Sequence, residues 1–206
     1  MKLILASASP RRAQILRDAG LRVGISRANV NERRKRGETA RTMTRRLAEA
    51  KARAVMKRLG DEAGRTIVIG ADTIVEVNGE LLGKPQSRKA ARKMLAKLAG
   101  RTHRVVTSVV ALRLPDRAQV IATESTRVRF APIDAHEIAE YVMTGEPLDK
   151  AGAYALQGIG GRFIEKIDGC YFNVVGLPLA RLYRMLIELG WQSGARNKSR
   201  RGKAAG

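Results

Sequence analysis

The sequence predicts an α/β protein built on one mixed sheet, and three observations support this class. Short apolar runs typical of buried strands alternate with segments of helical periodicity. Two long β-prone runs, at 103–114 and 118–130, flank a Pro-Asp turn, and an Asn-Gly pair at 78–79 favours another hairpin, so antiparallel pairs belong to the sheet. The chain of 206 residues, 44% of them hydrophobic, is long enough for one domain with a sizeable core.

The first predicted elements are a strand over 2–6 and a helix that begins at Pro10. The apolar run at 3–5 is much shorter than the roughly 7–15 residues of a secretory signal core, so we interpret it as a buried strand. Ser9 is a favoured N-cap residue, Pro10 suits the first helical position, and Gly20 ends the helix. The sequence therefore predicts strand, tight loop and helix.

Turn and capping signals divide the rest of the chain. They predict an exposed basic loop at 31–37 and a long helix at 39–59. A strand at 66–77 with a short return at 81–82 and a second helix at 87–100 should follow. Asp134 and Glu137 form a capping-box pattern, which predicts a helix to about 143. We then expect a glycine-rich functional loop at 144–161, a hairpin at 162–175 that contains Cys170, and a final helix at 178–190.

Composition limits the domain organisation and the environment. We expect a single domain over 1–191 and a disordered basic tail over 192–206, because the tail has five basic residues and no acidic ones. The net charge of +21 attracts polyanions, either nucleotides or nucleic acid. Cys170 is the only cysteine, which favours a reducing, cytoplasmic compartment. No run approaches the ~18 apolar residues of a membrane span.

The turn Ser7-Ala8-Ser9-Pro10-Arg11-Arg12 is the first candidate site. A strand ends and a helix begins here, and free N–H groups at a helix N-terminus favour anions. The two hydroxyls and two guanidiniums in this turn could cradle a triphosphate. An ordinary Ser-Pro helix start with solvated arginines fits the same residues.

Asp72, in Gly70-Ala71-Asp72-Thr73, interrupts an apolar β-run and is the second candidate. An ionised carboxylate among the flanking isoleucines and valines is costly unless a cation or hydrogen-bond donors partner it. A metal ion or a catalytic water could supply that partner, and so could a structural hydrogen bond to a backbone turn. The position at a strand end favours a cleft.

Four further polar residues have ambiguous local patterns. Glu32 lies in a loop crowded with arginines, and Lys51 and Lys84 could equally be surface lysines. Gln157 lies in a glycine-bearing segment, where its amide could contact a base edge or belong to a surface turn. Neither histidine has a partner at metal-ligand spacing, and no P-loop or dinucleotide-binding fingerprint is present.

Taken together, the motifs resemble the Maf family of nucleoside triphosphate pyrophosphatases over about residues 3–190. Five separated blocks in the family's order carry the resemblance. They are Leu5-Ala6-Ser7-Ala8-Ser9-Pro10-Arg11-Arg12, Gly70-Ala71-Asp72-Thr73, Leu82-Gly83-Lys84-Pro85, Asp149-Lys150-Ala151-Gly152-Ala153-Tyr154 and Val175-Gly176-Leu177-Pro178.

The resemblance implies an elongated mixed sheet with flanking helices, in two lobes around a nucleotide-binding cleft, and a homodimer. It implies hydrolysis of nucleoside triphosphates to the monophosphate and pyrophosphate. Asp72 matches the family's catalytic acid–base position. Ser7, Arg11 and Arg12 match its phosphate-binding turn, in which Ser9 is a further substrate-binding candidate.

The resemblance also implies a divalent cation, Mg²⁺ or alternatively Mn²⁺. Glu32, Lys51 and Lys84 match charged positions that line the cleft, and Glu32 and Asp72 are the candidate metal ligands. Asn31 stands where many members have a second acid beside the loop glutamate.

The family divides by nucleobase, and three positions bear on the branch. Arg11, Thr73 and Gln157 match residues that mark the dTTP/UTP branch, in which modified pyrimidine nucleotides are also substrates. The alternatives are a 7-methyl-GTP pyrophosphatase and a basic protein that binds nucleic acid or regulates septum formation. Few aromatic residues, 4% of the chain, weaken the nucleic-acid hypothesis. The basic tail could still bind nucleic acid weakly and without sequence preference.

Overall fold

The computed structural model describes residues 1–60 and 64–192. Within these residues, seven strands form one sheet in the order β2-β1-β3-β5-β6-β7, with β4 paired to β3. The strands are β1 Lys2–Leu5, β2 Val23–Ile25, β3 Thr66–Val77, β4 Glu80–Leu82, β5 Thr102–Leu114, β6 Gln119–Phe130 and β7 Ile164–Asp168. Strand β1 is parallel to β2 and β3, and the other pairs are antiparallel. The predicted mixed α/β sheet is confirmed.

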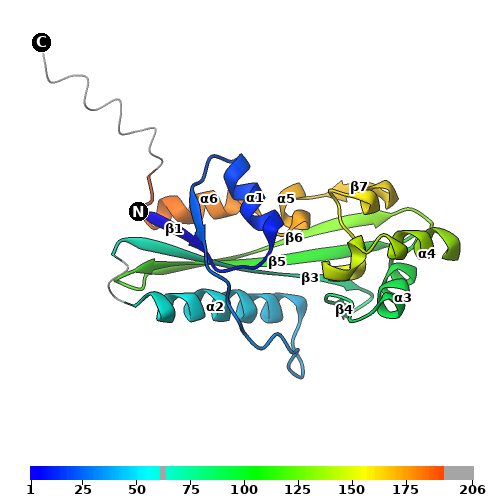
Figure 1. Ribbon diagram of the computed structural model, residues 1–206, viewed down its shortest axis with the longest axis horizontal. Helices are drawn as coiled ribbons and strands as arrows, with labels where there is room; N and C mark the ends of the chain where they lie inside the picture. Colours follow the sequence, from blue (N-terminus) through cyan, green and yellow to red (C-terminus); the bar gives the residue numbers. More distant parts are fainter. Residues whose placement is uncertain (61–63, 193–206) are drawn as a thin grey trace, which may run out of the picture.

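Helices cover both faces of the sheet. They are α1 Pro10–Asp18, α2 Ala40–Leu59, α3 Arg88–Leu98, α4 Ala135–Met143, α5 Tyr171–Val175 and α6 Leu179–Glu188. Figure 1 shows α2 on one face and α1, α5 and α6 on the other. Short 3-10 turns, η2 Glu146–Asp149, η3 Ala151–Ala153 and η4 Ile159–Phe163, follow α4.

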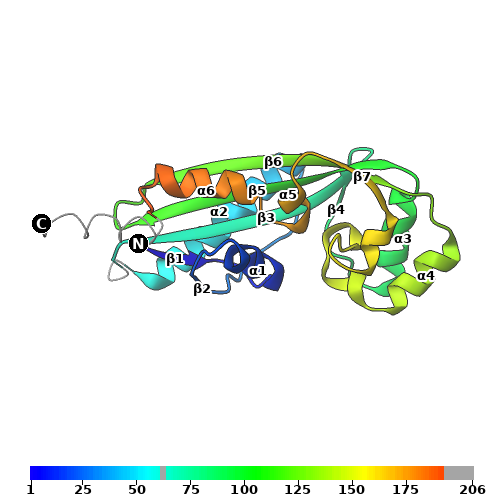
Figure 2. The same cartoon turned by 90° about the horizontal axis from the view of Figure 1, so that it is seen from above.

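The molecule is elongated and has two lobes, as predicted. The long strands β3, β5 and β6 run from the lobe of β1, β2, α1 and α2 towards a second lobe built by α3, α4, β4 and the 3-10 turns (Figure 2). Each lobe has its own apolar core. One core joins α1 and α6 to β1, β3 and β5, and another surrounds Tyr141 and Phe130 in the second lobe.

Local capping explains where three helices begin. Thr39 caps α2 in a reciprocal capping box with Thr42, and Ser87 accepts a hydrogen bond from the Ala90 N–H at 3.1 Å. The predicted capping box of Asp134 and Glu137 is confirmed at the start of α4. None of the helices in the described residues is long and apolar enough to cross a membrane.

The predicted hairpin over 162–175 is wrong. Only β7 is a strand there, and it pairs with β6, whereas the second half forms α5. Cys170 is therefore the N-cap residue of α5 and not a strand residue. Gly169, with φ of +124°, turns the chain out of the strand, and the buried Asn173 side chain then fixes α5 to the sheet.

One further difference concerns β2, and one prediction falls on residues that the structure does not describe. Strand β2 was not expected, because its three residues have no clear alternation and gain their stability from parallel pairing with β1. The predicted basic tail lies outside the described residues from 193 onward.

Candidate functional site

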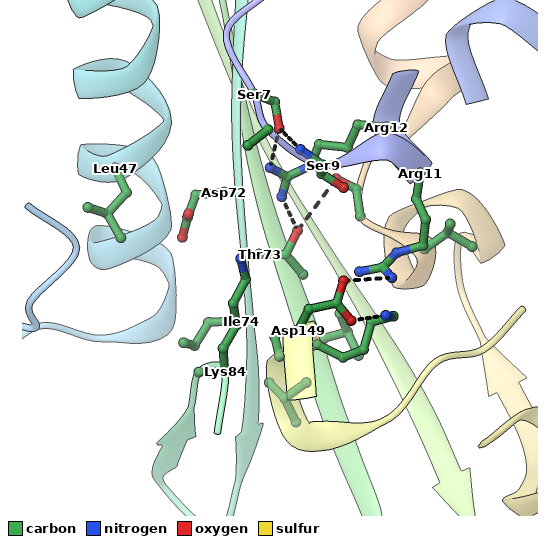
Figure 3. Close-up of a pocket in the computed structure, with 18 of the residues that line it drawn as sticks. Ser7, Ser9, Arg11, Arg12, Leu47, Asp72, Thr73, Ile74, Lys84 and Asp149 are labelled. Atoms are coloured by element: carbon green, nitrogen blue, oxygen red, sulfur yellow. Dashed lines mark hydrogen bonds and ion pairs between the residues drawn. The ribbon is translucent and has the colours of Figure 1, made fainter. Parts of the chain in front are cut away.

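A cavity of about 700 Å³ lies between the two lobes. Its walls come from the β1–α1 turn, α2, β3, the segment after β4, the 3-10 turns and the end of α5 (Figure 3). All ten residues singled out from the sequence line it, namely Ser7, Ser9, Arg11, Arg12, Glu32, Lys51, Asp72, Thr73, Lys84 and Gln157.

Close packing of α2 on β3 brings a lysine to Asp72. A Cβ atom at Gly70 would lie 2.1 Å from the Ala48 carbonyl oxygen and 2.9 Å from the Ala52 nitrogen, so the approach requires glycine. Alternate residues of a strand share a face, so Asp72 points to the same side of β3 as Gly70. Lys51, three residues after Ala48 on α2, lies on the helix face that meets Asp72.

The Lys51 ammonium bridges two carboxylates in the cleft. Its Nζ donates to Asp72 Oδ1 at 2.7 Å and lies 2.6 Å from Glu32 Oε1. The Lys51 and Asp72 side chains are only 11% and 10% exposed, whereas that of Glu32 is 54% exposed. Desolvation therefore acts most strongly on Asp72.

The pKa values of the two carboxyl groups move in opposite directions. Burial raises the pKa of Asp72, and the charge and hydrogen bond of Lys51, with the charge of Arg12, only partly oppose this. Burial also acts on Glu32, but the hydrogen bond and charge of Lys51 and the charge of Lys84 outweigh it and lower the pKa of Glu32. Asp72 is thus the stronger proton acceptor of the two.

Arg12 lies on the opposite face of β3 and is bound mainly to the protein itself. Its Nη2 donates to Thr73 Oγ1 at 2.9 Å, and its Nη1 donates to the Ala71 carbonyl oxygen at 2.8 Å and to Ser7 Oγ at 3.4 Å. Its Nε donates to the Gly176 carbonyl oxygen at 2.7 Å. Four of the five guanidinium N–H groups are therefore used within the chain, and one is left for a ligand.

The turn before α1 is folded by its own hydroxyls. Ser7 is buried, and its Oγ accepts a hydrogen bond from the Ser9 N–H at 3.1 Å. Ser9 occupies the predicted N-cap position, but its side chain makes no capping hydrogen bond and lines the cavity instead. The positive end of the α1 dipole consequently faces the cleft.

Arg11 reaches across the cleft to the other lobe. Its Nη1 lies 3.8 Å from Asp149 Oδ2, and Asp149 also accepts a hydrogen bond from Lys150 (Figure 3). Burial lowers the pKa of the Arg11 guanidinium, and the charges of Asp149 and Glu146 oppose this. The ion pair leaves most of the Arg11 donors available at the boundary of the lobes.

Lys84 and Gln157 complete the cleft from the second lobe. Lys84 follows β4 and extends towards Asp72 and Thr73 (Figure 3), and no carboxylate within the described residues pairs with it. Gln157 is exposed and lies on the rim of the same cavity. Both side chains can therefore contact a ligand without first breaking an internal bond.

The polar residues that are linked to Thr73 by hydrogen bonds were not predicted from the sequence. Thr73 Oγ1 lies 2.9 Å from Thr107 Oγ1, which in turn donates to the Asn173 carbonyl oxygen at 3.2 Å. Asn173 Nδ2 donates to the Val105 carbonyl oxygen and to Thr126 Oγ1, both at 2.9 Å. Polar residues inside apolar runs were the available signal, but their partners are more than 20 positions away along the chain.

The cleft offers two carboxylates to a metal ion. Across 1–60 and 64–192, no group of three or more acidic, histidine or cysteine side chains could hold a metal. Asp72 and Glu32, which share Lys51, nevertheless suit Mg²⁺, because this ion commonly takes one or two protein carboxylates together with water and substrate phosphate oxygens.

The fold and the cleft define the class of the protein. Cationic groups from two lobes surround a buried carboxylate and a helix N-terminus, which is the arrangement expected of an α/β enzyme that acts on a phosphorylated substrate.

The Maf-like protein family matches residues 2–189, so the chain belongs to the Maf family. A relative from Pelotomaculum thermopropionicum is 47% identical over 92% of this chain and 97% of its own length. Another, from Symbiobacterium thermophilum, is 46% identical over 92% of this chain and 95% of its own. Both relatives bear the name dTTP/UTP pyrophosphatase.

Among solved structures, the Staphylococcus aureus Ham1 protein shows a weak likeness. It is 20% identical, with a TM-score of 0.47 over 80% of each chain, which is too distant to bear on function. The resemblance in the sequence motifs is thus confirmed by the family match and by the relatives.

Proposed function

We propose that the protein hydrolyses dTTP and UTP to the nucleoside monophosphate and pyrophosphate. The observation that carries this proposal is the buried Asp72–Lys51 pair inside a cleft lined by cations from both lobes. The names of the relatives support the substrates. Modified pyrimidine triphosphates that keep the same base edge belong to the same substrate class.

The proposed reaction is attack of water on the α-phosphorus. A bond forms between the water oxygen and phosphorus, and the bond from the α-phosphorus to the bridging oxygen of the leaving pyrophosphate breaks. Asp72 lies within β3 and not at a strand end as the sequence suggested, and it accepts the proton of the attacking water, for which its raised pKa and its pairing with Lys51 in the cleft suit it. Arg11 and Lys84 stabilise the charge that accumulates on the phosphate oxygens.

We propose Mg²⁺ as the cofactor, with Mn²⁺ as an alternative, held by Glu32 and Asp72. When bound, the ion neutralises phosphate charge and lowers the pKa of a coordinated water. Lys51 holds the two carboxylates near each other and limits their repulsion. Arg12 holds the turn before α1 against β3, and its remaining N–H is available to a substrate oxygen in the cavity.

Base selection is assigned to Gln157. Its amide has both a donor and an acceptor, which matches the alternating donor and acceptor on the edge of uracil or thymine. Thr73, also a candidate from the sequence, contributes indirectly, because its hydroxyl is bound by Arg12 and Thr107.

The direct test is a substrate panel with Mg²⁺: dTTP, UTP, CTP, GTP, ATP and 7-methyl-GTP, with products separated by chromatography. We expect monophosphate and pyrophosphate from dTTP and UTP. Cleavage of 7-methyl-GTP alone would replace the proposed substrate branch. No cleavage of any triphosphate, with either metal, would favour the nucleic-acid-binding or septum-regulating alternative.

Replacing Lys84 should weaken substrate binding. We expect Lys84→Ala to raise the KM for dTTP about tenfold, because a charge-assisted contact to phosphate is lost, at roughly 1.5 kcal/mol. Lys89→Ala removes an exposed lysine outside the cavity and is the matched control. Unchanged kinetics in Lys84→Ala would remove this residue from the site.

Three further expectations remain predictions. The homodimer follows from the family resemblance, and light scattering of the purified protein checks it. A cytoplasmic location follows from the lone cysteine. Weak nucleic-acid binding through the basic tail predicts a salt-dependent interaction that disappears when residues 192–206 are removed.

A further inference from the structure

Glu146 was not among the site residues, yet two of the three hydrogen bonds that its carboxylate accepts come from the segment that follows Gln157. Its Oε1 accepts hydrogen bonds from the Tyr141 hydroxyl at 2.7 Å and from the Gly160 N–H at 3.0 Å. Its Oε2 accepts one from the Ile159 N–H at 3.0 Å. Glu146 thus holds the chain immediately after Gln157.

Tyr141 holds the same segment on the other side of Gln157. Its hydroxyl oxygen accepts a hydrogen bond from the Ala155 N–H at 3.0 Å while its hydrogen is donated to Glu146. The Tyr141 side chain is fully buried in the core of the second lobe, so it is a rigid support. Gln157 therefore lies on a short turn that is fixed at both ends.

Two glycines let the turn approach these groups closely. A Cβ atom at Gly158 would lie 2.2 Å from Glu146 Oε2, and one at Gly160 would lie 2.4 Å from the Tyr141 hydroxyl oxygen. Both distances are far below van der Waals contact. A side chain at 160 would meet the buried Tyr141 ring, whereas one at 158 would displace the Glu146 carboxylate from its bonds to Ile159 and Gly160.

The protonation states support the same arrangement. Burial acts to raise the pKa of Glu146, but hydrogen bonds from Gly160, Tyr141 and Ile159 outweigh it and lower that pKa. Burial and the bond to Glu146 raise the pKa of Tyr141. The carboxylate therefore stays an acceptor and the phenol stays a donor across the neutral range.

We propose that Glu146, together with Tyr141, is a positioning residue for pyrimidine selection: it fixes the turn that presents the Gln157 amide to the base. This rests on the proposed function, in which Gln157 contacts the base. A backbone held on both sides of Gln157 limits the positions that its amide can reach, so the amide is presented to one place on the base edge and adapts less readily to cytosine. Glu146 acts through Gln157 and does not itself contact the substrate.

The test is a double-mutant cycle on the UTP-to-CTP ratio of kcat/KM. We compare the wild type, Glu146→Gln, Gln157→Ala and the double variant, with Glu140→Gln, an exposed glutamate of α4, as the control. Glu146→Gln should raise the KM for UTP and dTTP about tenfold and lower the UTP preference, with kcat nearly unchanged. The double variant should lose no more selectivity than Gln157→Ala alone.

Hydrogen exchange of the amides of 159 and 160 gives a readout independent of activity, and it should accelerate in Glu146→Gln but not in Glu140→Gln. If Glu146→Gln does not fold, Tyr141→Phe removes one hydroxyl only and should produce the same loss of selectivity. Full additivity of the two substitutions, or an unchanged UTP-to-CTP ratio, would overturn the proposal. Absence of dTTP and UTP cleavage by the wild type would instead overturn the proposed function.

Discussion

Asp72→Asn is expected to lower kcat for dTTP hydrolysis by about 10³-fold, the size of a lost general base. Asparagine keeps the shape of aspartate but cannot accept the proton of the attacking water. The fold should persist, because removal of a charge from a 10% exposed site relieves desolvation and leaves Lys51 paired with Glu32. Pyrophosphate release and thermal unfolding, measured on the same samples, check both parts.

The control for this substitution is Asp168→Asn. Asp168 is an exposed acid on β7 that is paired with Arg127 and does not line the cavity. It should retain wild-type kcat and KM. Near-normal turnover by Asp72→Asn would remove this residue from the chemical step.

Lys51→Met is expected to be the most damaging substitution for activity and stability together. Methionine preserves the buried stem of the side chain but leaves Asp72 and Glu32 facing each other without the cation between them. The pKa of Asp72, already raised by burial, should rise further because its main opposing charge is lost. The acid limb of the kcat/KM profile should therefore move to higher pH.

The stability of Lys51→Met should depend on pH with a defined sign. A carboxyl group whose folded pKa lies above its unfolded value binds protons more readily in the folded state, so stability falls as the pH rises through the folded pKa. Loss of the buried partner should lower the free energy of unfolding by about 3 kcal/mol where Asp72 is ionised, and by less where it is protonated.

Thermal unfolding across pH 5 to 9, with Lys57→Met on the exposed face of α2 as the control, measures this difference. A loss of stability that is equal at every pH would indicate a packing defect and contradict the electrostatic account. The control should show neither the shift of the profile nor the loss.

Periodicity and capping in the sequence were sufficient to predict most elements of the fold. Thr66–Val77 has the β-branched content of a buried strand, and Asp134 with Glu137 marks a helix start that depends only on neighbouring residues. The prediction of a hairpin at 162–175 was wrong because α5 is stabilised by Asn173, whose partners Val105 and Thr126 lie on β5 and β6. The local sequence pattern around Asn173 does not indicate its contacts with these two strands.

For the candidate site, too, the sequence predicted one part and only the structure showed the rest. The sequence by itself determined the family and pointed to ten of the residues that line the cavity, because separated motifs keep their order and their chemical types. Only the tertiary structure decided which of them contact one another. Close approach of α2 at Gly70 joins Lys51 to Asp72, and the internal bonds of Arg12 leave it one free donor. Glu146 became visible only through the turn it holds, since hydrogen bonds between distant segments depend on packing and have no periodic trace in the chain.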